Sequence, residues 1–190
     1  MEKNILSCAF TGHRPKSFSF GYDESSPEFE VLKTKIRNTI TQVCNAGCRT
    51  FYCGMAEGAD LWCGEIVLEM KDKFDPPLEI CAVAPFLTQS SGMSEINKVR
   101  YRKIMDHAKQ RFLVSRGFTN KCYQKRNYFM VDSCDALIAV YNENESKSGT
   151  GQTIRYAKKK NKKIFIIHIS KRFFVIKEPF SFFIFIISSR

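Results

Sequence analysis

Residues 5–15 read ILSCAFTGHRP, and this stretch decides how the rest of the chain is interpreted. From Ile5 to Thr11 the residues are almost all apolar, without the alternation that is typical of a half-exposed strand. We therefore expect a strand that is buried on both faces, as in a parallel sheet covered by helices. The run ends at Gly12-His13-Arg14-Pro15, a sequence that favours a sharp turn.

The same alternation of apolar runs and helical patterns continues along the chain. Ser26 and Pro27 supply an N-cap and a first helical residue, and Gly47 supplies a stop. Further strands are predicted at 50–53, 78–85, 111–115, 136–141 and 163–169, and further helices after Asp60 and at 94–108, 123–133 and 151–160. The pattern predicts an α/β domain over residues 3–169 with a Rossmann-like, doubly wound, mostly parallel sheet and helices on both faces.

Residues 170–190 form an apolar, basic tail that departs from this alternation. The tail has neither a helical nor an alternating pattern, so an edge strand and a poorly ordered, sticky segment both stay open for it. Its apolar stretch Phe182–Ile187 is far shorter than the ~20 residues that span a bilayer. With no recognisable signal peptide, we expect a cytoplasmic protein without a membrane span.

The composition fits a single globular domain and argues against disorder or a fibre, because 44% of the 190 residues are apolar and 26% are charged. Most of the eight cysteines lie in apolar runs and none forms a C-x-x-C pair, which predicts buried free thiols. The three histidines show no ligand spacing with the cysteines, so no metal site is expected.

The formal net charge of +11 is concentrated near the C-terminus. Residues 155–190 contain ten Lys or Arg and one acid, a net of +9, whereas residues 1–154 contain twenty and eighteen, a net of +2. Lysines at the end of a helix complement its dipole, which accounts for the cluster at 155–163 at least as well as contact with a phosphate backbone does.

Three polar, glycine-containing loops follow predicted strands or precede a helix, and we expect them to meet at one edge of the sheet. In such sheets ligands bind beyond the carboxyl ends of the strands, and glycines and helix N-termini favour the approach of an anion. The candidate ligand-binding residues in these loops are Gly12, His13, Arg14, Gly54, Met55, Glu57, Gly58, Asp60, Ser148, Gly149, Thr150 and Gln152. Neither a P-loop nor a G-x-G-x-x-G follows the first strand, which argues against an NTPase or an ordinary dehydrogenase.

Each of these side chains also has a structural interpretation. Arg14 and Arg126 are candidate phosphate ligands, because a guanidinium offers two parallel donors, and a surface salt bridge is the alternative. Glu57 either contacts a ribose hydroxyl or is solvated, and His13 either contacts a ligand or holds its turn. For Asp60 a helix cap is favoured over catalysis. Trp62 is interpreted as a helix-packing or pocket-wall residue, and the aromatic residues of YQKRNYF (123–129) are interpreted as core residues.

Four segments together resemble one family. TGHRP (11–15), CGMAEGADLWCGE (53–65), YQKRNYFMVDSCDALIAVYN (123–142) and SGTGQTIRYAKKK (148–160) are similar to the YpsA-like branch of the SLOG superfamily, over about residues 3–169. That superfamily also contains the DNA-processing protein DprA and the LOG phosphoribohydrolases. The resemblance implies a bacterial protein whose glycine-rich loops bind a nucleotide or nucleotide-derived phosphate ligand, with a regulatory role in cell division or stress. It implies no other cofactor, and it leaves a homodimer open.

The comparison with LOG enzymes favours binding without LOG-type turnover. Arg126 and the pair Gly149-Thr150 match the LOG pattern, but Gln152 and Thr153 stand where the LOG turn has two glutamates. An amide or hydroxyl cannot replace a carboxylate as a general base. Phosphoribohydrolase or N-glycosidic hydrolysis is the alternative, with Glu57 and Arg126 as catalytic candidates. A third function, DprA-like binding of single-stranded DNA, is disfavoured because the lysine cluster contains only one aromatic residue, Tyr156.

Overall fold

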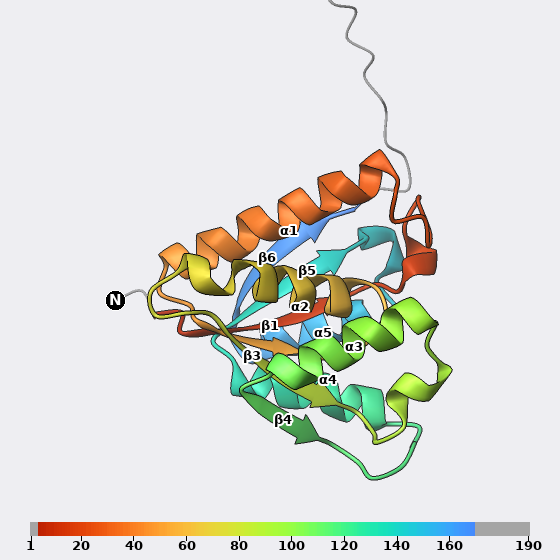
Figure 1. Cartoon of the computed structure of the whole chain (residues 1–190). Coiled ribbons are helices and arrows are strands. Elements are labelled where there is room, and N and C mark those ends of the chain that lie inside the picture. Colours follow the sequence, from red (N-terminus) through yellow and green to blue (C-terminus); the bar gives the residue numbers. More distant parts are fainter. Residues whose placement is uncertain (1–3, 170–190) are drawn as a thin grey trace, which may run out of the picture.

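The sheet consists of six parallel strands: β1 (Ser7–Gly12), β2 (Thr50–Cys53), β3 (Glu79–Ala84), β4 (Gln110–Leu113), β5 (Ala136–Tyr141) and β6 (Lys163–His168). Their order across the sheet is β4-β3-β2-β1-β5-β6 (Figure 1). The computed structural model describes residues 4–169, so the expectation for the tail at 170–190 lies outside the described residues. All six predicted strands are present, with ends that shift by up to two residues.

Five helices connect the strands: α1 (Pro27–Asn45), α2 (Ala59–Met70), α3 (Glu95–His107), α4 (Cys122–Ser133) and α5 (Gly149–Lys159). Short 3-10 turns lie at η1 (Pro15–Ser17), η2 (Lys71–Lys73), η3 (Gln89–Gly92) and η4 (Glu143–Glu145). The predicted cap of α1 is confirmed, because the Ser26 hydroxyl accepts from the backbone N–H of Phe29 and Pro27 is the first helical residue. None of these helices is long and apolar enough to cross a membrane, within the residues that were described.

The helices cover both faces of the sheet, which confirms the doubly wound, Rossmann-like fold. In Figure 1, α1, α2 and α3 lie on the near face of the sheet and α4 and α5 lie behind it. Strand β5 is buried on both faces. Its Ile138 and Val140 pack into the core beneath the first three helices, whereas Leu137 and Ala139 pack against α4 and α5. Because side chains alternate along a strand, a strand covered on both faces must be apolar at every position.

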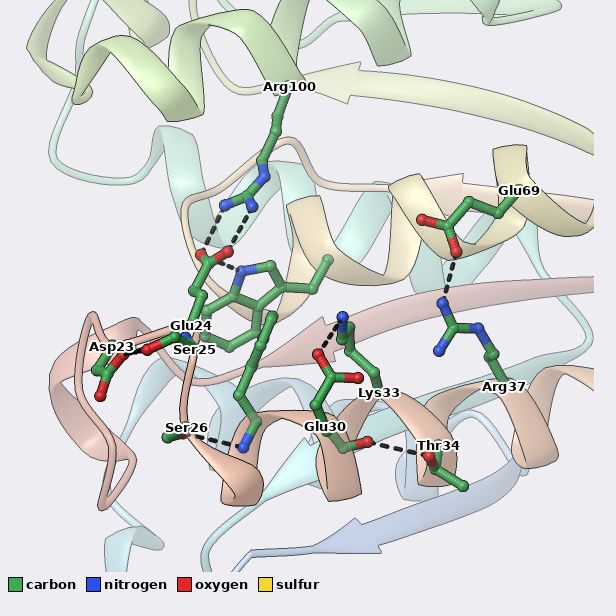
Figure 2. A network of polar contacts seen from close by, with 12 residues as sticks. Asp23, Glu24, Ser25, Ser26, Glu30, Lys33, Thr34, Arg37, Glu69 and Arg100 are labelled. Atoms are coloured by element: carbon green, nitrogen blue, oxygen red, sulfur yellow. Dashed lines mark hydrogen bonds and ion pairs between the residues drawn. The ribbon is translucent and has the colours of Figure 1, made fainter.

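A polar network joins α2 and α3 to the loop before α1, on the outside of the near face. Arg100 of α3 forms a bidentate ion pair with Glu24 (Figure 2), and its Nε lies 2.8 Å from Oε2 of Glu65 in α2. The indole N–H of Trp62 donates to Oε1 of Glu24 at 2.8 Å. We call Glu24, Trp62, Glu65 and Arg100 the helix clamp. The predicted packing role of Trp62 is confirmed, since the ring is 2% exposed and meets Phe29 at 5.0 Å between centroids.

All eight cysteines are free and buried, as the sequence predicts. Burial raises the pKa of the Cys53 and Cys134 thiols to about 12, so both stay protonated at neutral pH. They therefore serve as small apolar side chains of the core.

Candidate functional site

An open cleft of about 270 Å³ lies at the carboxyl ends of β1 and β5. In the sheet, β2 lies beside β1 on one side and β6 lies beside β5 on the other. The strand order therefore reverses between β1 and β5, where the cleft lies. Its walls come from the loop after β1 and from the N-terminal turns of α4 and α5. We call it the main cleft. It occupies the position where open α/β sheets bind their ligands.

Positive groups face the main cleft from two of its walls. Arg14 and Lys16 line it, and no carboxylate of the described residues pairs with the Arg14 guanidinium, which lies 5.9 Å from the ring centre of Tyr123. The N-terminus of α5 contributes Ser148, Gly149 and Thr150. The first N–H groups of a helix have no partner inside the helix and carry a partial positive charge. The cleft therefore suits an anion.

A buried ion pair forms one side of the main cleft. Nη1 of Arg126 lies 2.7 Å from Oδ2 of Asp60, and both side chains are about 95% buried. The carboxylate also accepts from the backbone N–H of Ala56 at 3.4 Å, while Nε of Arg126 is buried without a partner among the described residues. The cap interpretation of Asp60 needs correction, because Gly58 occupies the N-cap of α2 and Asp60 lies in the first turn.

Gly54 lies against this ion pair and does not line the main cleft. A Cβ at position 54 would lie 1.5 Å from Nη1 of Arg126 and 2.5 Å from Oδ2 of Asp60. The glycine therefore makes room for the buried guanidinium. The interpretation of Gly54 as a point of ligand approach is thereby corrected, since protein atoms already fill the space above it.

His13 is held at the end of β1 on the floor of the main cleft. Its Nδ1 lies 3.3 Å from Oε2 of Glu145, and its ring stacks on Tyr141 at 5.7 Å between centroids. Burial lowers the pKa of His13, and the Glu145 carboxylate opposes that shift. Its Nε2 is buried with no hydrogen-bond partner in the described part of the chain.

The structure brings together eight of the thirteen residues that the sequence predicts for the site. The predicted residues that line the main cleft are Gly12, His13, Arg14, Asp60, Arg126, Ser148, Gly149 and Thr150. Those that do not line it are Gly54, Met55, Glu57, Gly58 and Gln152. The second group lies mainly in the loop after β2, because that loop turns inward into α2 and its Met55 is fully buried.

Glu57 faces a second cavity, of about 410 Å³, beside the main cleft. Its Oε1 accepts from the side-chain amide of Asn97 at 3.0 Å and from the backbone N–H of Ser94 at 3.3 Å. Neither of the two interpretations of Glu57 describes this arrangement fully, because the half-buried carboxylate anchors the start of α3 and also lines a cavity. Arg14 and Tyr123 line both cavities, so the two spaces are neighbours with a shared wall.

Sequence reasoning missed six polar residues that line the main cleft: Thr11, Lys16, Ser17, Tyr123, Asn127 and Glu145. Tyr123 is exposed and lines the cleft, so its interpretation as a core residue is wrong. A signal was present in the sequence, because Tyr123 lies three residues before Arg126 and four before Asn127, spacings that bring each pair to one side of a helix. No such periodicity marks Glu145, which a 3-10 turn brings to His13 and to the Ser17 hydroxyl at 3.0 Å.

The two residues at the positions of the LOG glutamates, Gln152 and Thr153, do not line the main cleft. Thr153 is 1% exposed and accepts from the amide of Asn127 at 2.9 Å, which ties α5 to α4. Gln152 is half-buried on α5 and does not line the main cleft. The carboxylates that do line it, Asp60 and Glu145, are engaged by Arg126 and by His13 and Ser17.

These features define a Rossmann-like α/β protein with a polar, cationic cleft at the switch point of its sheet. A family model described as "YspA SLOG family" (YpsA) matches residues 8–172, and the chain belongs to this family. UPF0398 proteins of Bacillus thuringiensis (strain Al Hakam) and Bacillus cereus (strain AH187) are each 30% identical over 161 residues, which cover 82% of this chain and 84% of theirs.

A solved structure has a similar fold. It is DNA processing protein A from Helicobacter pylori, whose description concerns its single-stranded DNA binding mode. The TM-score is 0.57 at 18% identity, and the match covers 86% of this chain. The chain spans only 65% of that protein's length. This likeness concerns the fold.

Proposed function

We propose that this SLOG protein binds a nucleotide or a nucleotide-derived phosphate compound in the main cleft and acts as a regulatory binding protein. The observation that carries the proposal is the convergence of Arg14, Lys16 and the N-terminus of α5 on one cleft. A guanidinium and a helix N-terminus are both strong partners for phosphate oxygens. Within the described residues, Arg14 has no carboxylate partner that a phosphate would have to displace.

The neutral and acidic groups of the main cleft complement the rest of such a ligand. Asn127 and Glu145 line the wall beside the cations and offer acceptors and donors for ribose hydroxyls. Arg126 is held by Asp60, and its remaining buried N–H faces no partner among the described residues. Binding without turnover is favoured because the carboxylates of the cleft already serve as partners of Arg126 and His13. A general base must be able to accept a proton from the reacting group.

Calorimetric titration with AMP, GMP and ADP-ribose tests this proposal. We expect at least one of them to bind, and the Arg14→Ala variant to bind it about tenfold more weakly or worse, the usual scale for one charge-assisted hydrogen bond. Arg102→Ala is the matched control, since Arg102 is exposed on α3 and lines neither cavity. Folded protein that binds none of the three compounds would contradict the proposal, and so would an unchanged affinity in Arg14→Ala.

Turnover is tested on the same samples. Incubation with AMP or GMP is expected to release no free adenine or guanine above the level of a protein-free control. Release that depends on Arg126 or Glu57 would replace simple binding with N-glycosidic hydrolysis.

Binding of single-stranded nucleic acid is the second candidate function, and the fold likeness to DNA processing protein A favours it. The basic C-terminal end of α5 gives it little support. Nζ of Lys160 pairs with Asp132 at 3.0 Å, and Lys162 donates to the backbone carbonyl of Cys134, so these lysines have structural partners. They also lie at the opposite edge of the sheet from the main cleft, beside the start of β6. An oligonucleotide that binds with steep salt dependence would support this function.

A further inference from the structure

The second cavity has a different chemistry from the main cleft beside it. Its aromatic wall consists of Phe86, Phe118 and Tyr123, whose rings meet edge to face at 5.6 to 6.4 Å between centroids. Phe86 is buried, whereas Phe118 is 64% and Tyr123 36% exposed. Exposed aromatic rings are costly to leave in water, and rings held in place by a buried neighbour are a ready platform for stacking.

The polar side of this cavity is rich in hydrogen-bond acceptors. Nε2 of Gln89 donates to the backbone carbonyl of Met55 at 2.9 Å, which fixes the orientation of the amide and leaves Oε1 as an acceptor. Gln89 is 93% buried, and its Oε1 has no partner among the described residues. The Glu57 carboxylate adds further acceptor capacity on the same lining. A ligand that suits this cavity must therefore present N–H donors at the edge of a planar ring.

The shared wall connects this cavity to the proposed phosphate site. Arg14 and Tyr123 line both spaces, and the guanidinium lies over the Tyr123 ring at 5.9 Å from its centre. A ligand whose phosphate contacts Arg14 in the main cleft thus has its other end beside the aromatic wall. In a nucleotide a ribose joins the phosphate to the base. One nucleotide therefore has the parts to place its phosphate in the main cleft and its base in the second cavity.

We propose that the second cavity is a nucleobase subsite, in which an amine-bearing purine stacks on Phe118 and Tyr123 and donates to Glu57 and Gln89. This inference rests on the proposed function, because it places the phosphate of the same ligand in the main cleft. Guanine fits this chemistry well, because its exocyclic amine and its ring N–H lie side by side and both donate. The subsite therefore sets the specificity of the cleft for the base.

Ribose 5-phosphate and GMP separate the subsite from the main cleft, because ribose 5-phosphate carries the phosphate and sugar without a base. By calorimetry, GMP is expected to bind at least tenfold more tightly than ribose 5-phosphate. In Phe118→Ala this advantage is expected to shrink about tenfold, while the affinity for ribose 5-phosphate stays the same. Leu87→Ala is the matched control, because Leu87 is 70% exposed beside Phe86 and lines neither cavity.

The possible results discriminate between the two proposals. Equal affinities for GMP and ribose 5-phosphate, or a GMP advantage that survives in Phe118→Ala, would overturn the subsite and leave the main cleft intact as a phosphate site. Failure of both compounds to bind the wild-type protein would overturn the proposed function together with the subsite. IMP, which lacks the exocyclic amine of GMP, is expected to bind several-fold more weakly than GMP, and equal binding would overturn the role of the amine.

Discussion

The helix clamp and the main cleft are both polar, but they differ in whether their charged and polar groups have partners within the protein. In the clamp, the Arg100 guanidinium is bound by Glu24 (Figure 2) and also by Glu65. Glu24 in turn accepts from the Trp62 indole. In the main cleft, Arg14 has no carboxylate partner among the described residues, and Arg126 and His13 each keep one buried nitrogen without a hydrogen bond.

This difference separates polar groups that are paired within the fold from those that we propose to bind a ligand. Folded proteins rarely leave buried polar atoms unpaired, because each such atom costs about 1–3 kcal/mol. Five buried side-chain atoms of the described residues lack a partner, and four of them, on His13, Gln89, Arg126 and Asn142, follow strands at the carboxyl edge or line the cavities there. The unpaired groups thus gather at the carboxyl edge of the sheet, where we propose that the ligand binds, whereas the clamp joins elements of the fold.

The largest effect is expected from the buried ion pair, which lies at the boundary between these two roles. Asp60→Ala leaves the Arg126 guanidinium buried without its counter-charge, and we expect the free energy of unfolding to fall by about 3–5 kcal/mol in urea denaturation. The double variant Asp60→Leu with Arg126→Met removes both charges and should regain much of that loss. A double variant as unstable as Asp60→Ala would show that packing, and not the unpaired charge, determines the cost.

The sequence predicts the strands, the helices and the meeting of two loops at the carboxyl edge of the sheet. The strands and helices follow from periodicity and caps, as Ser26 and the apolar run of β1 illustrate. The loops after β1 and before α5 were also predicted to meet, because parallel strands bring their carboxyl ends to one edge.

The direction of individual side chains could not be predicted in the same way. Gly54 lies in a glycine-containing loop of the kind that binds ligands. Only the fold shows that Arg126, on α4, fills the space beside this glycine. Similarly, Glu57 and Asp60 are only three residues apart in the sequence, but the chain turns inward between them into α2, so that they line different cavities. These contacts are made between segments that are distant along the chain, so a local sequence pattern cannot predict them.

A smaller loss of stability is expected from the helix clamp. Arg100→Met keeps the apolar stem of the side chain but removes the ion pairs with Glu24 and Glu65, which should lower the free energy of unfolding by about 1–3 kcal/mol. The affinity for a nucleotide should stay within twofold of wild type, since the clamp lines neither cavity. A large loss of binding in a folded Arg100→Met variant would erase the distinction between the two regions.

The reciprocal result is expected for Arg14→Ala. Because Arg14 has no carboxylate partner in the described residues, its removal should change the free energy of unfolding by less than about 0.5 kcal/mol in the same urea experiment. Together with the loss of affinity expected by calorimetry, this would place Arg14 among the groups that serve a ligand. Destabilisation as large as that of Arg100→Met would assign it to the fold instead.

The smallest effect is a dependence of stability on pH that His13 contributes. Burial lowers the pKa of His13 in the folded state, so below about pH 6.5 the unfolded chain binds this proton more readily than the folded one. The contribution to stability is therefore present above that pH and is lost as the pH falls toward the lowered pKa. His13→Gln should lose less stability than wild type between pH 7.5 and 5.5, whereas His107→Gln, at an exposed position, should follow wild type.

Backbone amide shifts in a ¹H–¹⁵N NMR titration with GMP test the central distinction most directly, because they report on both regions in one experiment. Shifts are expected at residues 12–14 and 148–150 of the main cleft and at residues 57, 89 and 118 of the second cavity, with residues 24, 62, 65 and 100 of the helix clamp unchanged. Shifts concentrated at the clamp, or no shifts at saturating GMP, would contradict this expectation.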